Sequence, residues 1–325
     1  MNFQKNEKTG FYEGFALVKS CDKKSAKNGT FFLDAVLGDK DGEIYAKMWD
    51  YREENTPMPK VNTIVKVRGM LQQYNGNDQF IIQRIRAVSD EDGVMLSDFV
   101  KSADCKGEDM LETIIGIVNG FSDEELKAVV LSMIEDNKTA LVTFPAAEKL
   151  HHAMLGGLLY HTLSIVRLAE CVCGIYPCID RELLISGAVL HDIAKIREYS
   201  LNDAGVVDGH TLEGMLLGHL VMGAEDVGRK CDELNVTSEK KFLLQHMLIS
   251  HHGQLEFGAA VRPGFIEAEV LSQLDMFDAN IYEMADALKD VEVGGFTNRL
   301  WMLDNRRFYN HGRIDVQPQA NIIEE

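Results

Sequence analysis

The hydrophobic and polar positions of the first ninety residues follow the pattern of β-strands. Residues 30–39 (TFFLDAVLGD) and 43–50 (EIYAKMWD) are short apolar runs on either side of the turn sequence KDG. Residues 62–74 (NTIVKVRGMLQQY) and 79–88 (QFIIQRIRAV) flank NGND, which is a strong hairpin signal. Short strands rich in β-branched and aromatic residues, joined by Gly, Asn and Asp turns, predict a small closed or partly closed barrel.

From about residue 106 the apolar positions change to a helical period. In residues 121–134 (FSDEELKAVVLSMI), Ser122 stands where an N-cap is expected and Glu125 follows three residues later, which predicts a capping box. No strand pattern alternates with the later segments, so we predict an all-helical bundle. The other stretches of helical periodicity are residues 155–172, 181–196, 213–230, 238–253 and 267–284.

The change of period indicates two domains, as expected for a chain of 325 residues. We expect the barrel over residues 1–90, a linker and lead-in helix over residues 91–115, and the bundle over residues 116–310. The last residues, 311–325, have no usable periodicity and are predicted to form a mobile tail. The expected fold class is therefore multidomain, a small β-barrel followed by an all-α bundle.

Composition indicates the cellular setting. No segment approaches the roughly 18 uninterrupted apolar residues that a membrane span needs, and the N-terminal MNFQKNEKTG is polar. The six cysteines are unevenly spaced, and CVCGIYPC lacks the second cysteine pair or the paired histidines of a zinc finger. We therefore expect free thiols in a soluble cytoplasmic protein that has no membrane partner. A homo-oligomer is compatible with the sequence.

Charge is distributed unevenly between the two predicted domains. The net charge is −18 at pH 7. Residues 1–100 contain 14 Lys and Arg against 15 Asp and Glu, whereas residues 101–325 contain 19 against 36. An acidic chain is unusual for a protein that binds nucleic acid, but the near-neutral barrel can still carry a local basic face. The acidic part offers clustered carboxylates that could hold cations.

Aromatic and basic residues are interleaved along the predicted barrel. In an OB-type barrel, aromatics of this kind stack on bases while Lys and Arg follow the sugar–phosphate backbone of a single strand. Any single aromatic is more often a core residue than a stacking one. The candidates for substrate binding are Phe31, Trp49 and Tyr74, with Phe32, Tyr45 and Phe80 nearby. The interleaved cations are Lys23, Lys24, Lys27, Lys47, Lys66, Arg68 and Arg84.

Seven of the ten histidines fall between Tyr160 and Gly253, inside the helical patterns. A single histidine on an apolar helix face is more often a hydrogen-bonded core residue than a metal ligand. Here, however, ligand-type residues recur once per predicted helix, as His161, His191 with Asp192, His219, His251 with His252, and Asp275. An antiparallel bundle can bring such positions to one level of its core. Burying them together would be prohibitive unless a cation neutralised them, so a metal site is expected.

The order H…HD…H…HH…D resembles that of the HD-domain metal-dependent phosphohydrolases. Over residues 11–312 the chain also resembles the YhaM-type 3′-to-5′ exoribonucleases, in which an OB-fold precedes an HD domain. The HD doublet alone is a weak signal, but the ordered set together with SHHG.LEFG..VRP is specific. The segments that carry the resemblance are HHAMLGGLLYHTLSIVRLA, AVLHDIAKIREYS, EGMLLGHLVMG, SHHGQLEFGAAVRPGFIEAEVLSQLDMFDA and FTNRLWMLDNRRFYNH.

The resemblance implies a metal-dependent exoribonuclease that acts on single-stranded RNA, or also single-stranded DNA, and releases nucleoside 5′-monophosphates. It implies two divalent cations, with Mn(II) as the expected metal. Mixed His and carboxylate ligation also suits Fe(II) or Co(II), and it disfavours Ca(II). The implied ligands are His161, His191, Asp192 and Asp275 for the first cation, and Asp192, His219, His251 and His252 for the second.

Asp192 can bridge two cations with its two oxygens, whereas His191, which points about 100° away around a helix, would bind only one. His210, in the sequence DGHTLEG, is the alternative to His219 as a ligand, but its Gly- and Asp-rich setting predicts a loop. We therefore favour His219.

Lys195 lies three residues after Asp192 and four after His191, on one face of the predicted helix. We expect Lys195 to contact a phosphate oxygen and to act in catalysis beside Asp192; the alternative is a solvated surface lysine. Arg262, in VRPG near the HH pair, is a second candidate for phosphate binding. Two histidines directly precede the segment AMLGGLLYH, His151 and His152. They could bind substrate or protonate the leaving oxygen, or they could simply mark the start of a helix.

Three functional classes stay open from the sequence. HD sites hydrolyse many phosphate esters, so a nucleotide or cyclic-dinucleotide phosphohydrolase is an alternative to the exonuclease. A non-catalytic single-strand-binding protein is the third class, and the complete ligand set disfavours it. The predicted barrel favours a polymeric substrate. RNA and single-stranded DNA are not distinguished, because contacts to a 2′-OH cannot be read from sequence.

Overall fold

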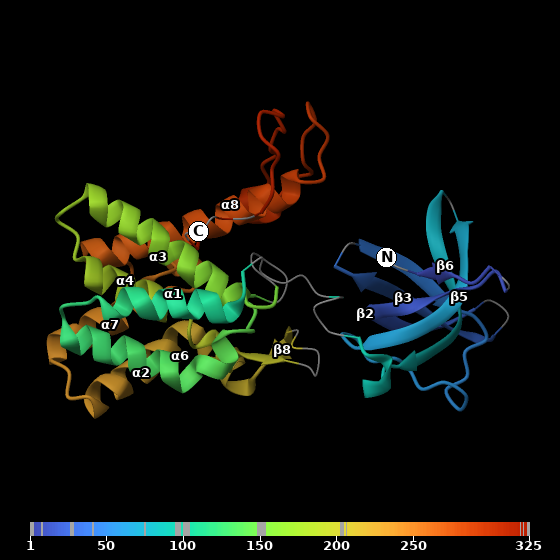
Figure 1. Cartoon of the computed structure of the whole chain (residues 1–325), viewed down its shortest axis with the longest axis horizontal. Helices are drawn as coiled ribbons and strands as arrows, with labels where there is room; N and C mark the ends of the chain where they lie inside the picture. The colour runs from blue at the N-terminus through green and yellow to red at the C-terminus, as the bar shows by residue number, and fades with distance from the viewer. Residues whose placement is uncertain are drawn as a thin grey trace. The chain divides into compact units, whose positions relative to one another are not determined.

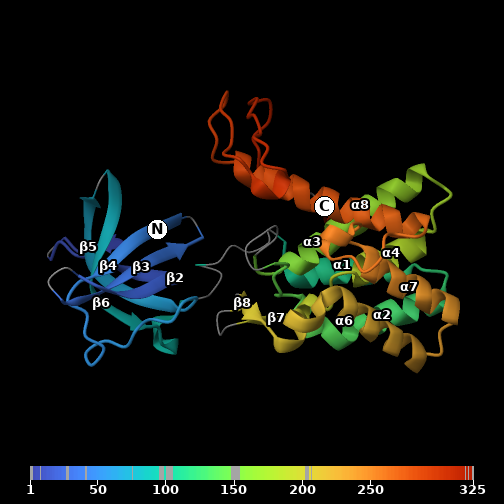
Figure 2. The same ribbon diagram turned by 180° about the vertical axis from the view of Figure 1, so that it is seen from behind.

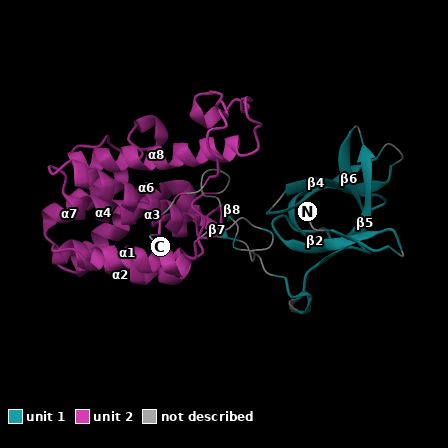
Figure 3. Cartoon of the chain, turned by 45° about the horizontal axis from the view of Figure 1, so that its top comes forward, with its two compact units in different colours: residues 1–102, 201–208 teal, residues 103–200, 209–325 magenta. Residues whose placement is uncertain are grey.

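The computed structural model consists of two compact units, residues 1–102 with 201–208 and residues 103–200 with 209–325 (Figure 3). Figures 1 and 2 show the strands of the first unit and the helices of the second from opposite sides. The structure describes residues 3–7, 9–26, 29–40, 42–74, 76–94, 99, 105–147, 154–201, 205, 207–318, 320, 322 and 323.

The first unit is a closed five-stranded barrel with one short added strand. Its strands are β1 (Gln4–Lys5), β2 (Tyr12–Ser25), β3 (Phe31–Asp39), β4 (Gly42–Met48), β5 (Ile64–Tyr74) and β6 (Asn77–Ala87), followed by the 3₁₀ turn η1 (Asp90–Asp92). The order is β1-β2-β3-β4-β6-β5, and β5 pairs back to β2 to close the sheet. β4 and β6 are parallel, and the other pairs are antiparallel. This Greek-key order of five closed strands confirms the predicted OB-fold.

Buried and exposed side chains alternate along the strands, and the buried ones fill the interior of the barrel. Leu33, Ala35 and Leu37 of β3 are buried, and Phe80 of β6 is fully buried among them. Phe80 is therefore a core aromatic, as the period of two along a half-buried strand requires.

The second unit is mainly helical. Its helices are α1 (Gly107–Asn119), α2 (Glu124–Leu141), α3 (Gly157–Ile175), α4 (Arg181–Leu190), α5 (Lys195–Glu198), α6 (Leu212–Glu233), α7 (Ser238–Ser250) and α8 (Ile266–Leu288). It also contains the 3₁₀ turns η3 (Leu255–Phe257) and η4 (Trp301–Leu303). The hairpin strands β7 (Tyr199–Leu201) and β8 (Val207–His210) are divided between the two units at residues 201 and 208. α1 crosses the predicted border at residue 116, so its first turns lie within the stretch assigned to the linker and lead-in helix.

α3 forms the centre of this bundle. Every residue from Gly157 to Val166 is buried, and α3 packs against α1, α4 and α8. The helix is long and apolar enough to cross a membrane, with a mean hydropathy of 1.4, but 56% of that window is buried inside the bundle. Packing as a core helix accounts for its apolar character.

The predicted capping box of α2 is wrong by one residue. Asp123 is the N-cap, and its side chain accepts hydrogen bonds from the backbone N–H groups of Glu125 and Leu126. The hydroxyl of Ser122 instead donates to Glu182 of α4 at 2.9 Å. Both residue types can cap a helix, and this contact from α4 decides between them.

Part of the segment predicted as a mobile tail packs against α3. Ile322 is buried, and its carbonyl accepts a hydrogen bond from Arg167 Nε at 3.0 Å. The hydroxyl of Tyr160 is hydrogen-bonded to the backbone of Ala320. These residues are held on the bundle rather than free, because α3 offers polar partners that no local sequence pattern reveals.

Candidate active site

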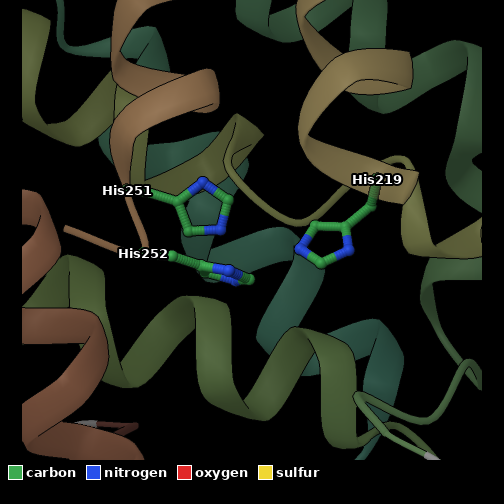
Figure 4. Close-up of side chains that lie close together, drawn as sticks. All are labelled: His219, His251 and His252. Carbon is green, nitrogen blue, oxygen red and sulfur yellow. The ribbon is translucent and has the colours of Figure 1, made fainter. Parts of the chain in front are cut away.

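Seven ligand-type side chains from five segments of the helical unit lie together. They come from α3, the turn after α4, α6, the end of α7 and α8, and they are His161, His191, Asp192, His219, His251, His252 and Asp275. The potential ligand atoms of His161, His191 and Asp192 lie within 4.8 Å of one another, and so do those of His219, His251 and His252. Figure 4 shows the second group, with His219 on α6 facing the two histidines that follow α7.

Asp192 stands between these two groups of histidines. Its Oδ2 lies 3.3 Å from His191 Nε2 and 3.7 Å from His161 Nε2. Its Oδ1 lies 3.3 Å from His219 Nε2 and 3.7 Å from His251 Nε2. One carboxylate therefore offers a separate oxygen to each group.

All five imidazoles use Nδ1 for a hydrogen bond within the protein. His191, His251 and His252 bond the carbonyl oxygens of Ala188, Leu248 and Phe257 at 2.7–2.8 Å. His161 and His219 bond the carboxylates of Asp278 and Glu198, both at 2.8 Å. A carbonyl or carboxylate oxygen can only accept, so Nδ1 carries the proton in each ring. The lone pair of a neutral ring is then on Nε2, which in every ring but that of His252 is the atom measured against Asp192 above.

Several of the atoms that meet at the centre are buried without a hydrogen-bond partner. Within the described residues, these atoms include Asp192 Oδ1, His219 Nε2 and His251 Nε2. Three acceptor atoms that converge in the protein interior without a donor are costly. A divalent cation is the group that such atoms fit, so the residues present match the metal that this type of site requires.

Burial and neighbouring charge set the protonation states of the site. Burial alone would raise the pKa of Asp192, but Lys195 and His191 hold that pKa well below its usual range. Burial lowers the pKa of both His251 and His252. For His161, burial acts to lower the pKa, but Asp275 and Asp278 outweigh it and raise the pKa to about 10. A cation bound at Nε2 of His161 would take the place of that proton.

Lys195 is buried, not solvated. Its exposed fraction is 7%, and its Nζ lies 2.7 Å from Asp192 Oδ2. Burial acts to lower the pKa of Lys195, but the carboxylate of Asp192 outweighs it and the pKa is raised. The alternative of a surface lysine is therefore wrong, although α4 ends at Leu190 and a turn rather than a continuous helix brings Lys195 to Asp192.

Two carboxylates that orient the site were missed from the sequence. Asp278 bonds His161, and it lies one helical turn after Asp275 on α8. Glu198 bonds His219 through both its ring Nδ1 and its backbone N–H. Asp278 lies three residues after Asp275, and residues i and i+3 share a helix face. This spacing could have suggested that the side chain of Asp278 points to the same site as that of Asp275. No comparable signal links Glu198 to His219.

A cavity of about 450 Å³ opens onto these residues. Asp192, Lys195 and Asp275 line its polar side. The apolar side of the cavity is formed by Phe257, Met276, Ala279 and Met302. The volume lies within the range of small-molecule sites, about 300–1,000 Å³.

The other candidates lie elsewhere or outside the described residues. His210 ends strand β8, where its ring packs on Tyr199 at 4.9 Å, so the predicted loop is wrong and it does not join the cluster. Arg262 is exposed in the loop after η3 and does not line the cavity. His151 and His152 lie outside the described residues.

The predicted stacking residues are exposed on the barrel. Phe31 and Trp49 are each 47% exposed and Tyr74 is 61% exposed. Trp49 packs on Phe32 at 4.9 Å, with Lys47 over both rings, and Lys23 lies over Phe31. Tyr74 lies apart from them along the chain, at the tip of the β5–β6 hairpin. Lys66, Arg68 and Arg84 line a separate groove of about 550 Å³.

Comparison with known proteins agrees with this architecture. The HD domain family matches residues 158–280. The 3′-5′ exoribonuclease YhaM of Listeria welshimeri is 38% identical over 298 residues, which cover 92% of this chain and 94% of the relative. That of Bacillus subtilis is 35% identical and covers 91% of this chain and 93% of its own length.

Among solved structures, the second OB-fold domain of replication protein A from Methanococcus maripaludis is 21% identical. It covers 24% of this chain and 82% of its own, with a TM-score of 0.20. The barrel assignment rests on the strand order and not on this likeness. Identity of 38% across nearly the full length of both chains, together with the HD match, shows that the protein is an HD-domain enzyme that belongs to the YhaM family of 3′-5′ exoribonucleases.

Proposed function

We propose that this protein shortens single-stranded RNA from its 3′ end and releases nucleoside 5′-monophosphates, using two divalent cations at the Asp192 cluster. The observation that carries the proposal is the common orientation of the five histidines: each is bonded at Nδ1, and in four of them Nε2 lies within 3.7 Å of an oxygen of Asp192. Ring orientation fixed in this way is typical of metal-ligating histidine.

The division of the cluster by Asp192 supports two cations rather than one. His161, His191 and Asp275 would hold the first with Oδ2 of Asp192, since His161 Nε2 is 3.1 Å from Asp275 Oδ1. His219, His251 and His252 would hold the second with Oδ1. The absence of thiolates and the mix of imidazole and carboxylate favour Mn(II), with Fe(II) and Co(II) as alternatives.

When bound, such a pair of cations supplies charge neutralisation for phosphoryl transfer and an attacking water of lowered pKa. The chain's own residues do the rest. Lys195, held beside Asp192 on the wall of the cavity, would place its ammonium near a phosphate oxygen. Phe257 and Met276 would provide an apolar surface for a base. The size of the cavity suits one terminal nucleotide, which favours removal of single residues over internal cleavage.

The barrel supports a polymeric substrate over a free nucleotide. Solvent-accessible aromatic rings with a cation over them, such as exposed Trp49 and half-buried Phe32 beneath Lys47, are typical of single-strand binding. Six free cysteines also support a location in the reducing cytoplasm.

The test is a digestion of a 5′-labelled single-stranded oligoribonucleotide by the full chain with Mn(II). We expect a ladder that shortens from the 3′ end, release of 5′-monophosphates, arrest at a duplex, and loss of all products in a chelator. The matched oligodeoxynucleotide measures the preference between RNA and DNA. Internal cuts, or hydrolysis of free nucleotides only, would contradict the proposal.

A further inference from the structure

The chain after α8 forms a hydrogen-bonded hairpin, which we call the C-terminal arm (residues 291–314). It appears in red beyond the end of α8 in Figures 1 and 2. Thr297 N–H donates to the carbonyl of Phe308 at 2.9 Å, and Leu300 N–H donates to that of Arg306 at 3.0 Å. Asn310 Nδ2 donates to the carbonyl of Val291 at 2.7 Å. The arm is therefore a hairpin held together by its own hydrogen bonds.

The arm differs in charge from the unit that carries it. It contains four arginines against two acidic residues, Glu292 and Asp304. Residues 101–325 as a whole contain 19 Lys and Arg against 36 Asp and Glu. A local excess of positive charge on an acidic unit is evidence for an anionic ligand at that place.

Three of the arm's four guanidinium groups, those of Arg299, Arg306 and Arg307, are held by backbone carbonyls. Arg306 Nε donates to Leu303 at 3.0 Å, and Arg307 Nε donates to Thr297 at 2.9 Å. Across the described part of the chain, none of the arm's arginines, Arg299 and Arg313 included, is ion-paired with a carboxylate. The charges of Arg299, Arg306 and Arg307 are therefore oriented by the backbone, and all four arginines remain available to a ligand.

Exposed aromatic rings accompany these arginines. Trp301 is 70% exposed, Phe296 54% and Tyr309 49%. Arg307 lies over the ring of Phe296 at 5.5 Å, and Arg306 over Phe308 at 5.4 Å. Surfaces on which bases stack between rings and guanidinium planes have this composition.

The arm is continuous with the catalytic cavity. Met302, the residue after Trp301 in η4, lines the same cavity as Asp192 and Lys195. A strand whose terminal nucleotide lies in the cavity would therefore meet Trp301 a short distance upstream.

We propose that the C-terminal arm is a second single-strand binding site. Its aromatic rings would stack on the bases, and its arginines would neutralise the phosphates, of the RNA nucleotides immediately upstream of the 3′-terminal one. The proposal rests on the proposed function, since it takes the substrate to be a single strand that enters the Asp192 cavity. The barrel and the arm would then hold different parts of one strand.

The first test compares Trp301→Ala with Phe242→Ala. Phe242 is a 63% exposed aromatic on α7 that does not line the cavity. Binding of a 5′-fluorescent oligoribonucleotide is measured by anisotropy in EDTA, where no turnover takes place. Trp301→Ala should bind the oligoribonucleotide about tenfold more weakly than the wild type, because one stacking contact is lost. Trp301→Phe should restore most of that affinity. Phe242→Ala should bind like the wild type. Equal binding by all four proteins would overturn the proposal.

The second test measures charge. Arg299→Gln with Arg313→Gln removes two arm cations, and Lys127→Gln with Lys138→Gln removes the same charge from α2. The slope of log K against log salt concentration should fall by about 0.7 per lost phosphate contact in the arm variant only. An unchanged slope there would contradict the phosphate contacts.

A direct probe uses the two tryptophans of the chain. In Trp49→Phe, Trp301 is the one tryptophan left, so its emission can be followed by selective excitation of tryptophan over tyrosine. A stacked base should quench this emission when oligoribonucleotide is added. No quenching at saturating oligoribonucleotide would overturn the stacking role.

The two proposals fail separately. Absence of a 3′-shortened ladder from the wild type would refute the proposed function, whereas a normal ladder with unaltered Trp301 and arginine variants would refute only the arm.

Discussion

Asp192 connects the two histidine groups of the site. Its oxygens face different sets of Nε2 atoms, and Oδ1 is buried without a hydrogen-bond partner among the described residues. Because both groups lie against this carboxylate, a change here should affect both of the proposed cations together.

Asp192→Asn should abolish hydrolysis while the fold is kept. An amide offers one neutral oxygen and a nitrogen that cannot bind a cation, so metal affinity falls on both sides. Metal content by mass spectrometry should drop from about two ions per chain, while circular dichroism stays like the wild type. More than about a tenth of wild-type activity with Mn(II) would contradict a shared ligand.

Lys195→Met should separate the catalytic role of this residue from its structural one. With Mn(II) the variant should keep its metal and turn over about a hundred to a thousand times more slowly, the effect of one contact made to the transition state. In EDTA its melting temperature should fall, because Asp192 loses its buried partner, which costs about 3–5 kcal/mol. Wild-type kinetics would leave Lys195 with only the structural role.

At the scale of elements, α6 depends on a break in its own helix. Gly218, directly before His219, has φ 70° and ψ 161°, between two helical stretches. This region is essentially restricted to glycine. The break allows the backbone N–H of His219 to donate to Glu198, and the same carboxylate orients the ring.

Gly218→Ala should therefore disturb metal binding through His219. The strain of a Cβ at this φ and ψ is about 1–3 kcal/mol, and relieving it would move His219. We expect a lower melting temperature and a loss of bound Mn(II). Gly116→Ala is the control: it lies inside α1 with no atom within 4 Å of the added Cβ, and it should stabilise by about 0.5–1 kcal/mol. Equal metal content in both variants would show that the break is not needed.

At the scale of the whole molecule, the candidate metal ligands and the candidate stacking residues lie in different units. All seven candidate ligands lie in the helical unit, and the exposed rings of Phe31 and Trp49 lie in the barrel. Chemistry and strand binding should therefore be separable.

Removal of residues 1–102 should leave hydrolysis of a small chromogenic phosphodiester with Mn(II) intact. Activity on a single-stranded oligoribonucleotide should fall tenfold or more, since base stacking contributes about 1–3 kcal/mol per base. In the full chain, Trp49→Ala should lower kcat/KM for the oligoribonucleotide only, whereas Tyr176→Ala, an exposed aromatic after α3, should not. Unchanged oligoribonucleotide cleavage without the barrel would favour a small-nucleotide phosphohydrolase.

The sequence alone determined the barrel, the bundle and the residue types of the site. Periods of 2 and 3.6 are local properties of strands and helices, so the boundaries of α3 and α7 could be predicted closely. His161, His191 and His219 could be predicted as neighbouring ligand candidates because one ligand-type residue recurs in each predicted helix, and this recurrence can be read without knowledge of packing.

The tertiary structure decided how these residues are oriented and what else they contact. His161 bonds Asp278 across 117 residues of sequence, and Glu182 engages Ser122 from 60 residues away, which leaves the cap to Asp123. The burial of Lys195, the sharing of Asp192 and the arm's position at the cavity depend on such long-range contacts. Hydrogen-bond direction and burial are properties of packed neighbours, whereas periodicity reports only on the segment that carries it.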